Sequence, residues 1–287
     1  MTKKTWLITG SSRGLGRSIA DAVLAQGDYV VATARRTADL EDLVGTHGDR
    51  VLPVPLDVTD PTAAAAAVQS AVDRFGRLDV VVNNAGYGTL GSIEETPVDV
   101  FRAQIETNLF GVVNVTRAAL PVLRKQRSGH FLQISTIGGR RAPGYGLAAY
   151  GTAKFGVEGF SEALAAEVKP FGVKVTIIEP GGFRTDWAGS SMAVIEPGED
   201  YRATVGYMIG HLKDGDLNGD PEKAGQVIAG VPYLDEPPLR LPLGSDAVSL
   251  IRAADEAKIA EIDAWQELSR STDADDARPR DLSGLNN

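Results

Sequence analysis

Short apolar runs alternate along this chain with longer segments in which apolar residues recur at helical spacing. The runs are Trp6–Thr9, Tyr29–Ala34, Val51–Pro55, Val80–Val82, His130–Ser135, Val173–Ile178 and a candidate last one, Leu239–Leu243. The helical segments are Gly14–Gln26, Pro61–Phe75 behind Asp60 as its cap, Pro97–Leu109, Gly111–Arg127, Tyr150–Lys169, Pro221–Ala229 and Ala247–Leu268. Strands that are apolar throughout are typical of parallel sheets covered by helices on both faces. The pattern therefore predicts an α/β fold with one doubly wound parallel sheet.

Length and composition narrow the class of protein. The 287 residues carry a net charge of −9 and include no cysteine and three histidines. An acidic chain is a poor partner for nucleic acid or an anionic membrane surface, and disulfides and thiolate metal sites are excluded. We expect no metal site, no signal peptide and no membrane span, and therefore a cytoplasmic protein. We predict a single domain over residues 1–272, with 183–219 as a substrate loop or lid, and a polar, disordered tail over 273–287.

A glycine-rich turn follows the first predicted strand and opens the first predicted helix. Its residues are Gly10, Ser12, Arg13, Gly14, Leu15 and Gly16. Glycine lets the backbone approach a diphosphate closely, and a helix N-terminus offers amide donors with positive potential. The spacing G-x-x-x-G-x-G differs from the standard dinucleotide fingerprint, but the strand–turn–helix context favours a cofactor site over a plain turn.

The end of the second strand indicates which dinucleotide binds. An acid about 20 residues past the glycine turn usually holds the ribose hydroxyl of NAD. Here that place has no acid, and Arg35 together with Arg13 suits a 2′-phosphate. The sequence therefore favours NADP, with NAD less favoured; two solvated surface arginines are the alternative. Asp57, which is followed by Val58, could contact the adenine or simply cap a turn. The run Asn84, Ala85 and Gly86 follows the fourth predicted strand, and it either borders the binding crevice of the sheet or forms a plain turn.

Tyr150 and Lys154 lie four residues apart, which places a phenol and an ammonium on one face of a helix. A nearby positive charge lowers a phenol's pKa, and a phenol tuned toward neutral pH can exchange a proton with an alcohol or ketone oxygen. Alone, the pair is weak evidence, because such spacings are common on ordinary helices.

In combination these motifs resemble the classical short-chain dehydrogenase/reductase family over about residues 5–190, and they are somewhat similar to its retinol- and steroid-type members. The resemblance implies a Rossmann-type sheet of about seven strands, hydride transfer between NAD(P) and an alcohol or ketone, and a homodimer or homotetramer. It implies that Tyr150 is the acid/base, that Lys154 holds the nicotinamide ribose, and that Asn108 keeps a relay water in place. Pro180, Gly181, Phe183 and Thr185 match the segment that contacts the nicotinamide.

One position departs from the family pattern. The family usually has two serines after the fifth strand, whereas this chain has Ser135 followed by Thr136. The matched donor to the substrate oxygen is Thr136, and a shift of one residue would make it Ser135. Tyr145 and Trp187 are predicted to line a substrate pocket suited to an apolar alcohol or ketone.

Two other functional classes stay open at this point. One is a non-redox enzyme on the same fold, such as an epimerase or dehydratase. The other is a regulator that only senses NADP(H), although a regulator needs no joint Asn108, Tyr150 and Lys154.

Overall fold

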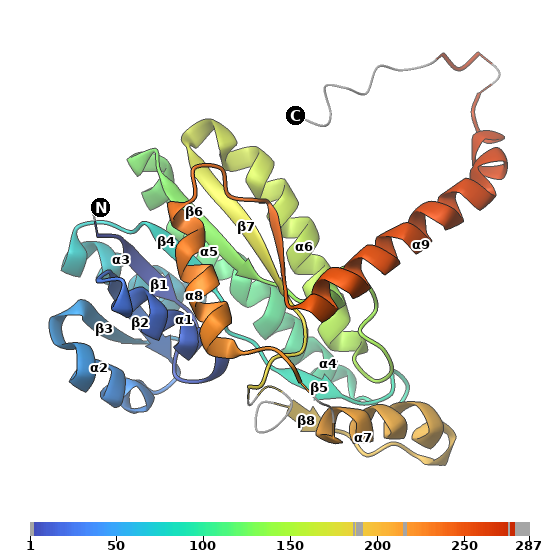
Figure 1. Cartoon of the computed structure of the whole chain (residues 1–287), viewed down its shortest axis with the longest axis horizontal. Coiled ribbons are helices and arrows are strands. Elements are labelled where there is room, and N and C mark those ends of the chain that lie inside the picture. Colours follow the sequence, from blue (N-terminus) through green and yellow to red (C-terminus); the bar gives the residue numbers. More distant parts are fainter. Residues whose placement is uncertain (1–2, 186, 188–191, 215–216, 275, 279–287) are drawn as a thin grey trace. The chain divides into compact units, whose positions relative to one another are not determined.

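The computed structural model describes residues 3–185, 187, 192–214, 217–274 and 276–278 of the chain. The structure divides into two compact units, Met1–Ile251 and Arg252–Asn287. The first unit holds the sheet, its covering helices and the site considered below (Figure 1).

A seven-stranded sheet with the order β3-β2-β1-β4-β6-β7-β9 forms the centre of the first unit. Its strands are β1 (Thr5–Ile8), β2 (Tyr29–Ala34), β3 (Val51–Pro55), β4 (Val80–Asn83), β6 (Gly129–Ile134), β7 (Val173–Pro180) and β9 (Arg240–Leu243). Every neighbouring pair runs parallel. The strand order reverses between β1 and β4, and this is the point at which open α/β sheets bind ligands. The predicted doubly wound, Rossmann-type fold is confirmed.

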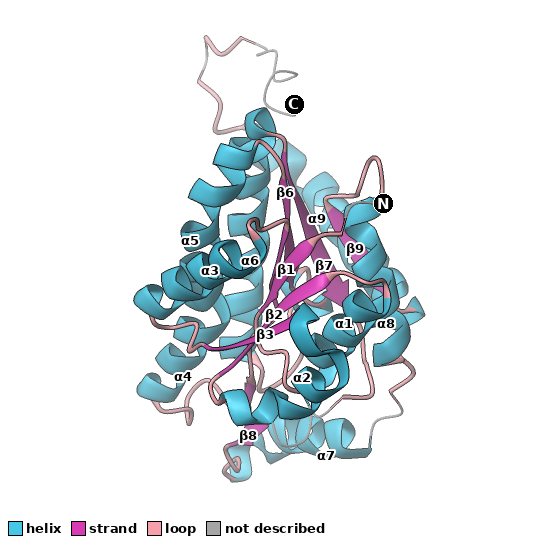
Figure 2. Ribbon diagram, turned by 90° about the vertical axis from the view of Figure 1, so that its left-hand side faces the viewer, coloured by secondary structure: helices cyan, strands magenta, loops and turns pink. Residues whose placement is uncertain are grey.

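Helices cover both faces of this sheet (Figure 2). On one face, α1 (Gly14–Ala25) packs closely against α8 (Pro221–Gly230), and α2 (Glu41–His47) lies near the sheet edge. On the other face lie α3 (Pro61–Phe75), α5 (Gly111–Gln126) and α6 (Ala148–Val168). Each face has its own apolar core, because strands buried on both sides present alternate residues to opposite layers.

Local sequence signals predicted several helices correctly. The Asp60 carboxylate accepts bonds from Thr62 N at 2.7 Å and Ala63 N at 3.2 Å, so the predicted cap and N1 proline of α3 are confirmed. Asp220 caps α8 in the same way. The predicted helix Pro97–Leu109 is α4 (Val98–Ile105) followed by a π-helical turn, Glu106–Phe110. Such turns often mark functional positions.

The segment predicted as a substrate loop contains structure of its own. It holds β8 (Met192–Val194), which pairs in parallel with β5 (Gly88–Leu90), and α7 (Tyr207–Asp214). Phe183 and Gly219 form an isolated parallel bridge, so the segment leaves the sheet and returns at one place.

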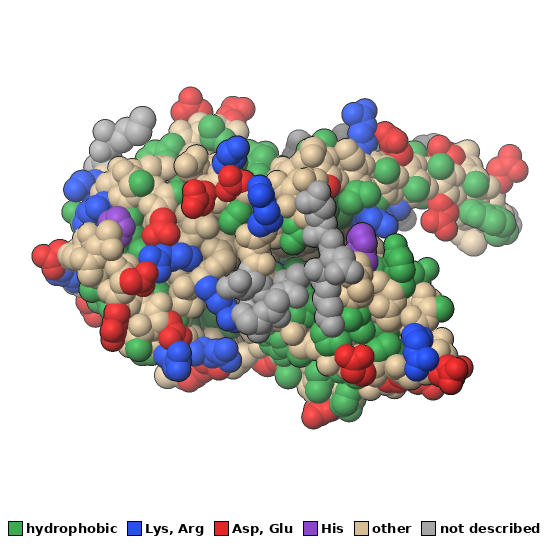
Figure 3. Space-filling model, turned by 60° about the horizontal axis from the view of Figure 1, so that its bottom comes forward, with side chains coloured by type: hydrophobic (Ala, Val, Ile, Leu, Met, Phe, Trp, Pro, Cys, Tyr) green, Lys and Arg blue, Asp and Glu red, His purple; other side chains and the backbone are tan. Residues whose placement is uncertain are grey.

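The second unit begins inside α9 (Ser245–Arg270), whose later turns expose the large apolar side chains of Ile259, Ile262, Trp265 and Leu268. Most of the tail predicted over 273–287 lies outside the described residues. None of the described helices is both long and apolar enough to cross a bilayer. On the face seen in Figure 3, basic and acidic side chains are interspersed.

Candidate active site

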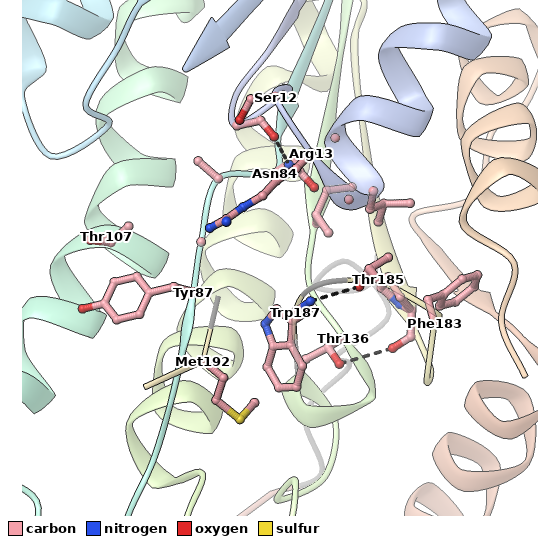
Figure 4. A pocket seen from close by; sticks show the side chains of 18 of the residues that line it. Ser12, Arg13, Asn84, Tyr87, Thr107, Thr136, Phe183, Thr185, Trp187 and Met192 are labelled. Atoms are coloured by element: carbon pink, nitrogen blue, oxygen red, sulfur yellow. Dashed lines mark hydrogen bonds between the residues drawn. The ribbon is translucent and has the colours of Figure 1, made fainter. Parts of the chain in front are cut away.

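A pocket of about 1400 Å³ lies at the carboxyl ends of the strands, where the strand order reverses (Figure 4). It is lined by most of the predicted site residues: Gly10, Ser12, Arg13, Gly14, Leu15, Gly16, Arg35, Asp57, Val58, Asn84, Ala85, Gly86, Ser135, Thr136, Tyr150, Lys154, Pro180, Gly181, Phe183, Thr185 and Trp187. Ligand pockets commonly measure 300–1000 Å³, so this volume suits a dinucleotide together with a second ligand.

The glycine turn forms a cradle that side chains would fill. Gly10 and Gly14 have φ values of +66° and +56°, which favour glycine. A Cβ at Gly16 would lie 2.3 Å from the Gly10 carbonyl oxygen and 2.4 Å from Asn84 Nδ2. The amino end of α1 therefore opens onto bare backbone, which is the arrangement that binds a diphosphate.

Asn84 ties this turn to the end of β4. Its Nδ2 donates to the carbonyl oxygens of Thr9 at 2.9 Å and Gly10 at 3.1 Å, and its backbone N–H donates to Thr9 Oγ1 at 2.9 Å. Asn108, in the π-helical turn, is fully buried. Its Nδ2 donates to Tyr87 O at 2.7 Å, and its Oδ1 accepts from Tyr87 N at 3.1 Å. The Asn108 side chain therefore holds the Gly86–Tyr87 turn; it does not line the pocket itself.

The two predicted phosphate-binding arginines meet at one end of the pocket. Arg13 and Arg35 are exposed there, and both charges help to lower the pKa of Asp39, whose main partner is Arg36 at 2.5 Å. Asp57 is engaged in a turn, because its Oδ1 accepts from Thr59 N at 3.0 Å and Thr59 Oγ1 at 2.7 Å. The capping role weighed for Asp57 from the sequence is therefore the one its contacts show, although it also lines the pocket.

Tyr150 and Lys154 lie side by side, buried at the pocket floor. Lys154 Nζ is 5.8 Å from the centroid of the Tyr150 ring and donates to Ile134 O at 2.7 Å. Burial lowers the pKa of Lys154 to about 8, and the charge of Glu158 opposes that shift. Burial raises the pKa of Tyr150, while a hydrogen bond with Thr136 opposes the rise. The lowering of the phenol pKa expected from Lys154 is therefore not what the structure shows, because burial sets the direction of the shift.

The hydroxyls of Thr136 and Ser135 have different surroundings. Thr136 Oγ1 contacts Tyr150 and donates to Pro180 O at 3.2 Å. Ser135 Oγ is buried, lies beside Gly139, and has no hydrogen-bond partner among the described residues. A Cβ at Gly139 would come 2.4 Å from it. Thr136 is therefore the hydroxyl that lies with the phenol.

Segments after β7 form the wall opposite the glycine turn. Thr185 faces Gly14, whose added Cβ would lie 3.8 Å from the threonine Cβ, and Thr185 Oγ1 accepts from Trp187 N at 3.4 Å. The Trp187 ring lies 4.9 Å from that of Tyr150 and is tilted by 54°. Tyr145 lies apart from this pocket: it is 55% exposed and lines a separate apolar hollow with Ile93 and Phe155.

Several lining residues were not found in the sequence. Tyr87 and Thr107 lie together on one side of the pocket, and Met192 enters from β8 (Figure 4). Tyr87 directly follows the Asn84–Gly86 turn, and this adjacency was a usable signal. Arg36 and Asp39 also line the pocket, and nothing in their local sequence marks them. Met192, Leu212 and Leu217 were not named individually, but they lie within 183–219, which was predicted as a substrate loop or lid.

The fold and the motifs define a nucleotide-binding α/β dehydrogenase, and residues 4–194 match the short chain dehydrogenase family. The chain belongs to that family. It is 51% identical over 270 residues to oxidoreductase BOA17 of Botryotinia fuckeliana, covering 93% of this chain and 98% of the relative. A solved short-chain dehydrogenase from Streptomyces avermitilis is 41% identical, with a TM-score of 0.89 and coverage of 95% and 99% of the two chains.

Two more distant solved structures differ in their cofactor. An alcohol dehydrogenase of Thermococcus sibiricus, 28% identical with a TM-score of 0.70, is complexed with 5-hydroxy-NADP and covers 84% of this chain and 96% of its own. A 3-ketoacyl-(acyl-carrier-protein) reductase of Brucella melitensis, 25% identical with a TM-score of 0.71 and the same coverage, is complexed with NADH.

Proposed function

We propose that this protein is an NADP-dependent oxidoreductase that transfers a hydride between the nicotinamide and an apolar alcohol or ketone. The observation that carries the proposal is the convergence of Tyr150, Lys154 and Thr136 in one pocket with a glycine cradle. The backbone at Gly10, Gly14 and Gly16 would hold the diphosphate, and Arg13 and Arg35 the 2′-phosphate. When bound, the cofactor supplies or accepts the hydride.

The chain's own residues supply the proton and stabilise charge on the substrate oxygen. Because burial raises the pKa of Tyr150, its phenol is protonated at neutral pH and can donate to a carbonyl oxygen. The Thr136 hydroxyl, which donates to Pro180 O in the structure, would turn its single proton toward the oxygen on which charge develops. Lys154, with a pKa of about 8, is largely protonated at pH 7 and can hold a ribose hydroxyl. The Trp187 ring packs beside the phenol ring.

The substrate side of the pocket is apolar. It is lined by Trp187, Met192, Ala193, Leu212 and Leu217, and the Tyr87 ring also lines the pocket. Such walls favour a ligand with hydrocarbon next to its reacting carbonyl. A screen of ketones with NADPH and NADH, run in parallel, tests both parts of the proposal. Consumption of NADH in preference to NADPH would remove the role given to Arg13 and Arg35.

Three variants assign the roles. Tyr150→Phe should lower kcat by 10²-fold or more, about the contribution of a general acid, and leave NADPH binding nearly unchanged. A pure NADP(H) sensor would have no turnover to lose. Thr136→Val should lower kcat about 10²-fold, whereas Ser135→Ala should retain most of it. Full turnover in both hydroxyl variants would refute the donor role.

A tenfold or greater loss of NADPH affinity is expected for Arg35→Ala, with NADH affinity unchanged, because a charge-assisted phosphate contact contributes about 1.5–3 kcal/mol. Arg124→Ala, which removes an exposed arginine in the last turn of α5, is the control.

The cytoplasmic location and the homo-oligomeric state remain predictions. Light scattering on the purified protein tests the oligomeric state.

A further inference from the structure

Behind Lys154 lies a buried group of charged side chains that the proposed reaction does not use. Glu158, one helical turn further along α6, is buried, and Glu179 at the end of β7 is fully buried. Arg240 in β9 joins them: its Nε lies 3.1 Å from Glu158 Oε2 and 3.6 Å from Glu179 Oε1. Arg140 Nη1 contacts Glu179 Oε1 at 3.1 Å. Buried carboxylates at this density are rare unless they are paired.

This group connects three parts of the candidate active site. Glu158 shares the α6 helix with Lys154, and its charge acts on that ammonium. Glu179 directly precedes Pro180, whose carbonyl oxygen accepts from Thr136. Arg140 follows the short helical turn that begins after Thr136. The group therefore joins the lysine helix, the hydroxyl loop and the segment after β7 through charged contacts.

The hydrogen bonding of the group is incomplete. Glu158 Oε1, Glu179 Oε2 and Ser135 Oγ are buried without a hydrogen-bond partner among the described residues. A Cβ at Gly139 would lie 3.1 Å from Glu158 Oε1 and 2.4 Å from Ser135 Oγ, so both atoms face the same glycine. A group retained only for stability would satisfy such atoms, because an unpaired buried acceptor costs about 1–3 kcal/mol.

We propose that Glu158, held in place by Arg240, is a positioning residue that acts as the counter-ion of Lys154 and keeps the buried ammonium protonated. The proposal rests on the proposed function of Lys154. Desolvation disfavours the charged form of a buried lysine, and an opposite charge one helical turn away offsets part of that cost. The other groups around the pair are Tyr150 and Glu162 on α6, Ile134 O and Ser135 at the end of β6, Glu179 on β7 and Arg240 on β9.

The test measures the lysine directly and without turnover. In full-length protein carrying ¹³Cε-labelled lysine, the Lys154 resonance is assigned with Lys154→Arg and titrated by NMR. Glu158→Gln should lower the Lys154 pKa by about one unit. Glu162→Gln is the matched control, because Glu162 also bonds Arg240 from the same helix but is exposed. No fall in Glu158→Gln, or an equal fall in Glu162→Gln, would overturn the proposal.

A second readout uses the pH profile of ketone reduction. Lys154 is charged below its pKa, so a lower pKa moves the alkaline loss of turnover to lower pH. A shift from about 8 to about 7 would reduce the protonated fraction at pH 8 about fivefold and leave pH 6 nearly unchanged. If no variant or wild type turns over any ketone while the NMR shift is present, the proposed function fails and the counter-ion role stands.

A conservative variant covers the case in which Glu158→Gln does not fold. Glu158→Asp retains the charge and should keep the Lys154 pKa within a few tenths of the wild-type value, with an unchanged pH profile. A fall of a full unit despite the retained carboxylate would overturn the role of charge.

Discussion

The two ends of the sheet both bury polar side chains, but they differ in how completely these are paired. At the amino end, Asp28 accepts bonds from Lys4 N and Trp6 Nε1, both at 2.9 Å, and from the Tyr233 hydroxyl. There too, His130 Nε2 lies 2.9 Å from Thr176 Oγ1, which itself donates to Pro238 O, so the histidine donates. At the carboxyl end, Ser135 Oγ, Glu158 Oε1 and Glu179 Oε2 have no protein partner among the described residues.

This difference indicates which buried groups stabilise the fold and which are available for function. Fully paired buried groups fix strand ends in place, and removing one partner leaves the others unsatisfied. Groups left unpaired beside a pocket retain capacity for a ligand or a proton. We therefore expect changes at the amino end to reduce stability with little effect on chemistry. At the carboxyl end we expect changes in the glycine cradle to affect cofactor binding, and removal of the unpaired Ser135 hydroxyl to cost no stability.

The largest expected effect is on stability, at the amino end. Asp28→Ala would leave the indole N–H of Trp6 and the hydroxyl of Tyr233 buried without their acceptor. We expect a loss of about 4 kcal/mol in the free energy of unfolding, measured by urea denaturation, with kcat unchanged in the folded fraction. Asp21→Ala, which removes an exposed partner of Arg17, is the control and should cost under about 0.5 kcal/mol. A parallel loss of kcat would break the distinction between the two ends.

At the carboxyl end, Gly16→Ala should act mainly on binding. The added Cβ would press on the Gly10 carbonyl and distort the cradle, so NADPH affinity should fall about 100-fold, or about 3 kcal/mol. Isothermal titration calorimetry measures this. Gly45→Ala in α2 meets nothing within 4 Å and should be neutral or stabilising. Unchanged NADPH affinity in Gly16→Ala would refute the cradle.

His130 predicts a pH dependence of stability. Burial lowers its pKa to about 3, from 6.5 in the unfolded chain. Between these values the unfolded state binds a proton that the native state does not, so stability falls as pH falls through this window. From pH 7 to pH 4.5 the wild type should lose about 2.5 kcal/mol more than His130→Gln, measured by urea denaturation. Equal losses in the two proteins would show that His130 titrates normally in the native state.

The smallest expected effect is on stability, and it distinguishes the neighbouring hydroxyls of Ser135 and Thr136. Ser135→Ala removes a buried, unpaired hydroxyl and should leave stability unchanged or raise it by up to about 1 kcal/mol. Thr136→Val loses the bond to Pro180 O and should lower stability by about 1 kcal/mol. Thermal unfolding resolves both. Strong destabilisation by Ser135→Ala would mean that its hydroxyl is paired in solution.

Sequence reasoning found the features that depend on local chain chemistry. The backbone at Gly10, Gly14 and Gly16 has no room for a side chain or has a φ that favours glycine, so the turn is visible in the sequence. The Asp60 cap acts over only three residues, so it is visible as well. The central strands were predicted to within about two residues at each end, because burial on both faces leaves an uninterrupted apolar run.

The features that were missed depend on contacts between distant segments. Glu158, Glu179 and Arg240 lie on three different elements, and only the sheet order brings them together. Tyr145 was predicted to line the substrate pocket with Trp187, whereas it lines a separate hollow. The pKa of Tyr150 was expected to fall because spacing reveals a neighbouring charge but not the depth of burial.

The bridge between Phe183 and Gly219 has a consequence for the evolution of this fold. Because Phe183 and Gly219 are bridged at one point beside the sheet, residues 192–214 between them can change without disturbing the strands of that sheet or Thr185, which faces the glycine cradle. A segment attached in this way can be exchanged as one unit. Transplanting residues 192–214 between members of the family should therefore transfer a preference among substrates, while the recipient keeps its own dinucleotide because Thr185 stays in place.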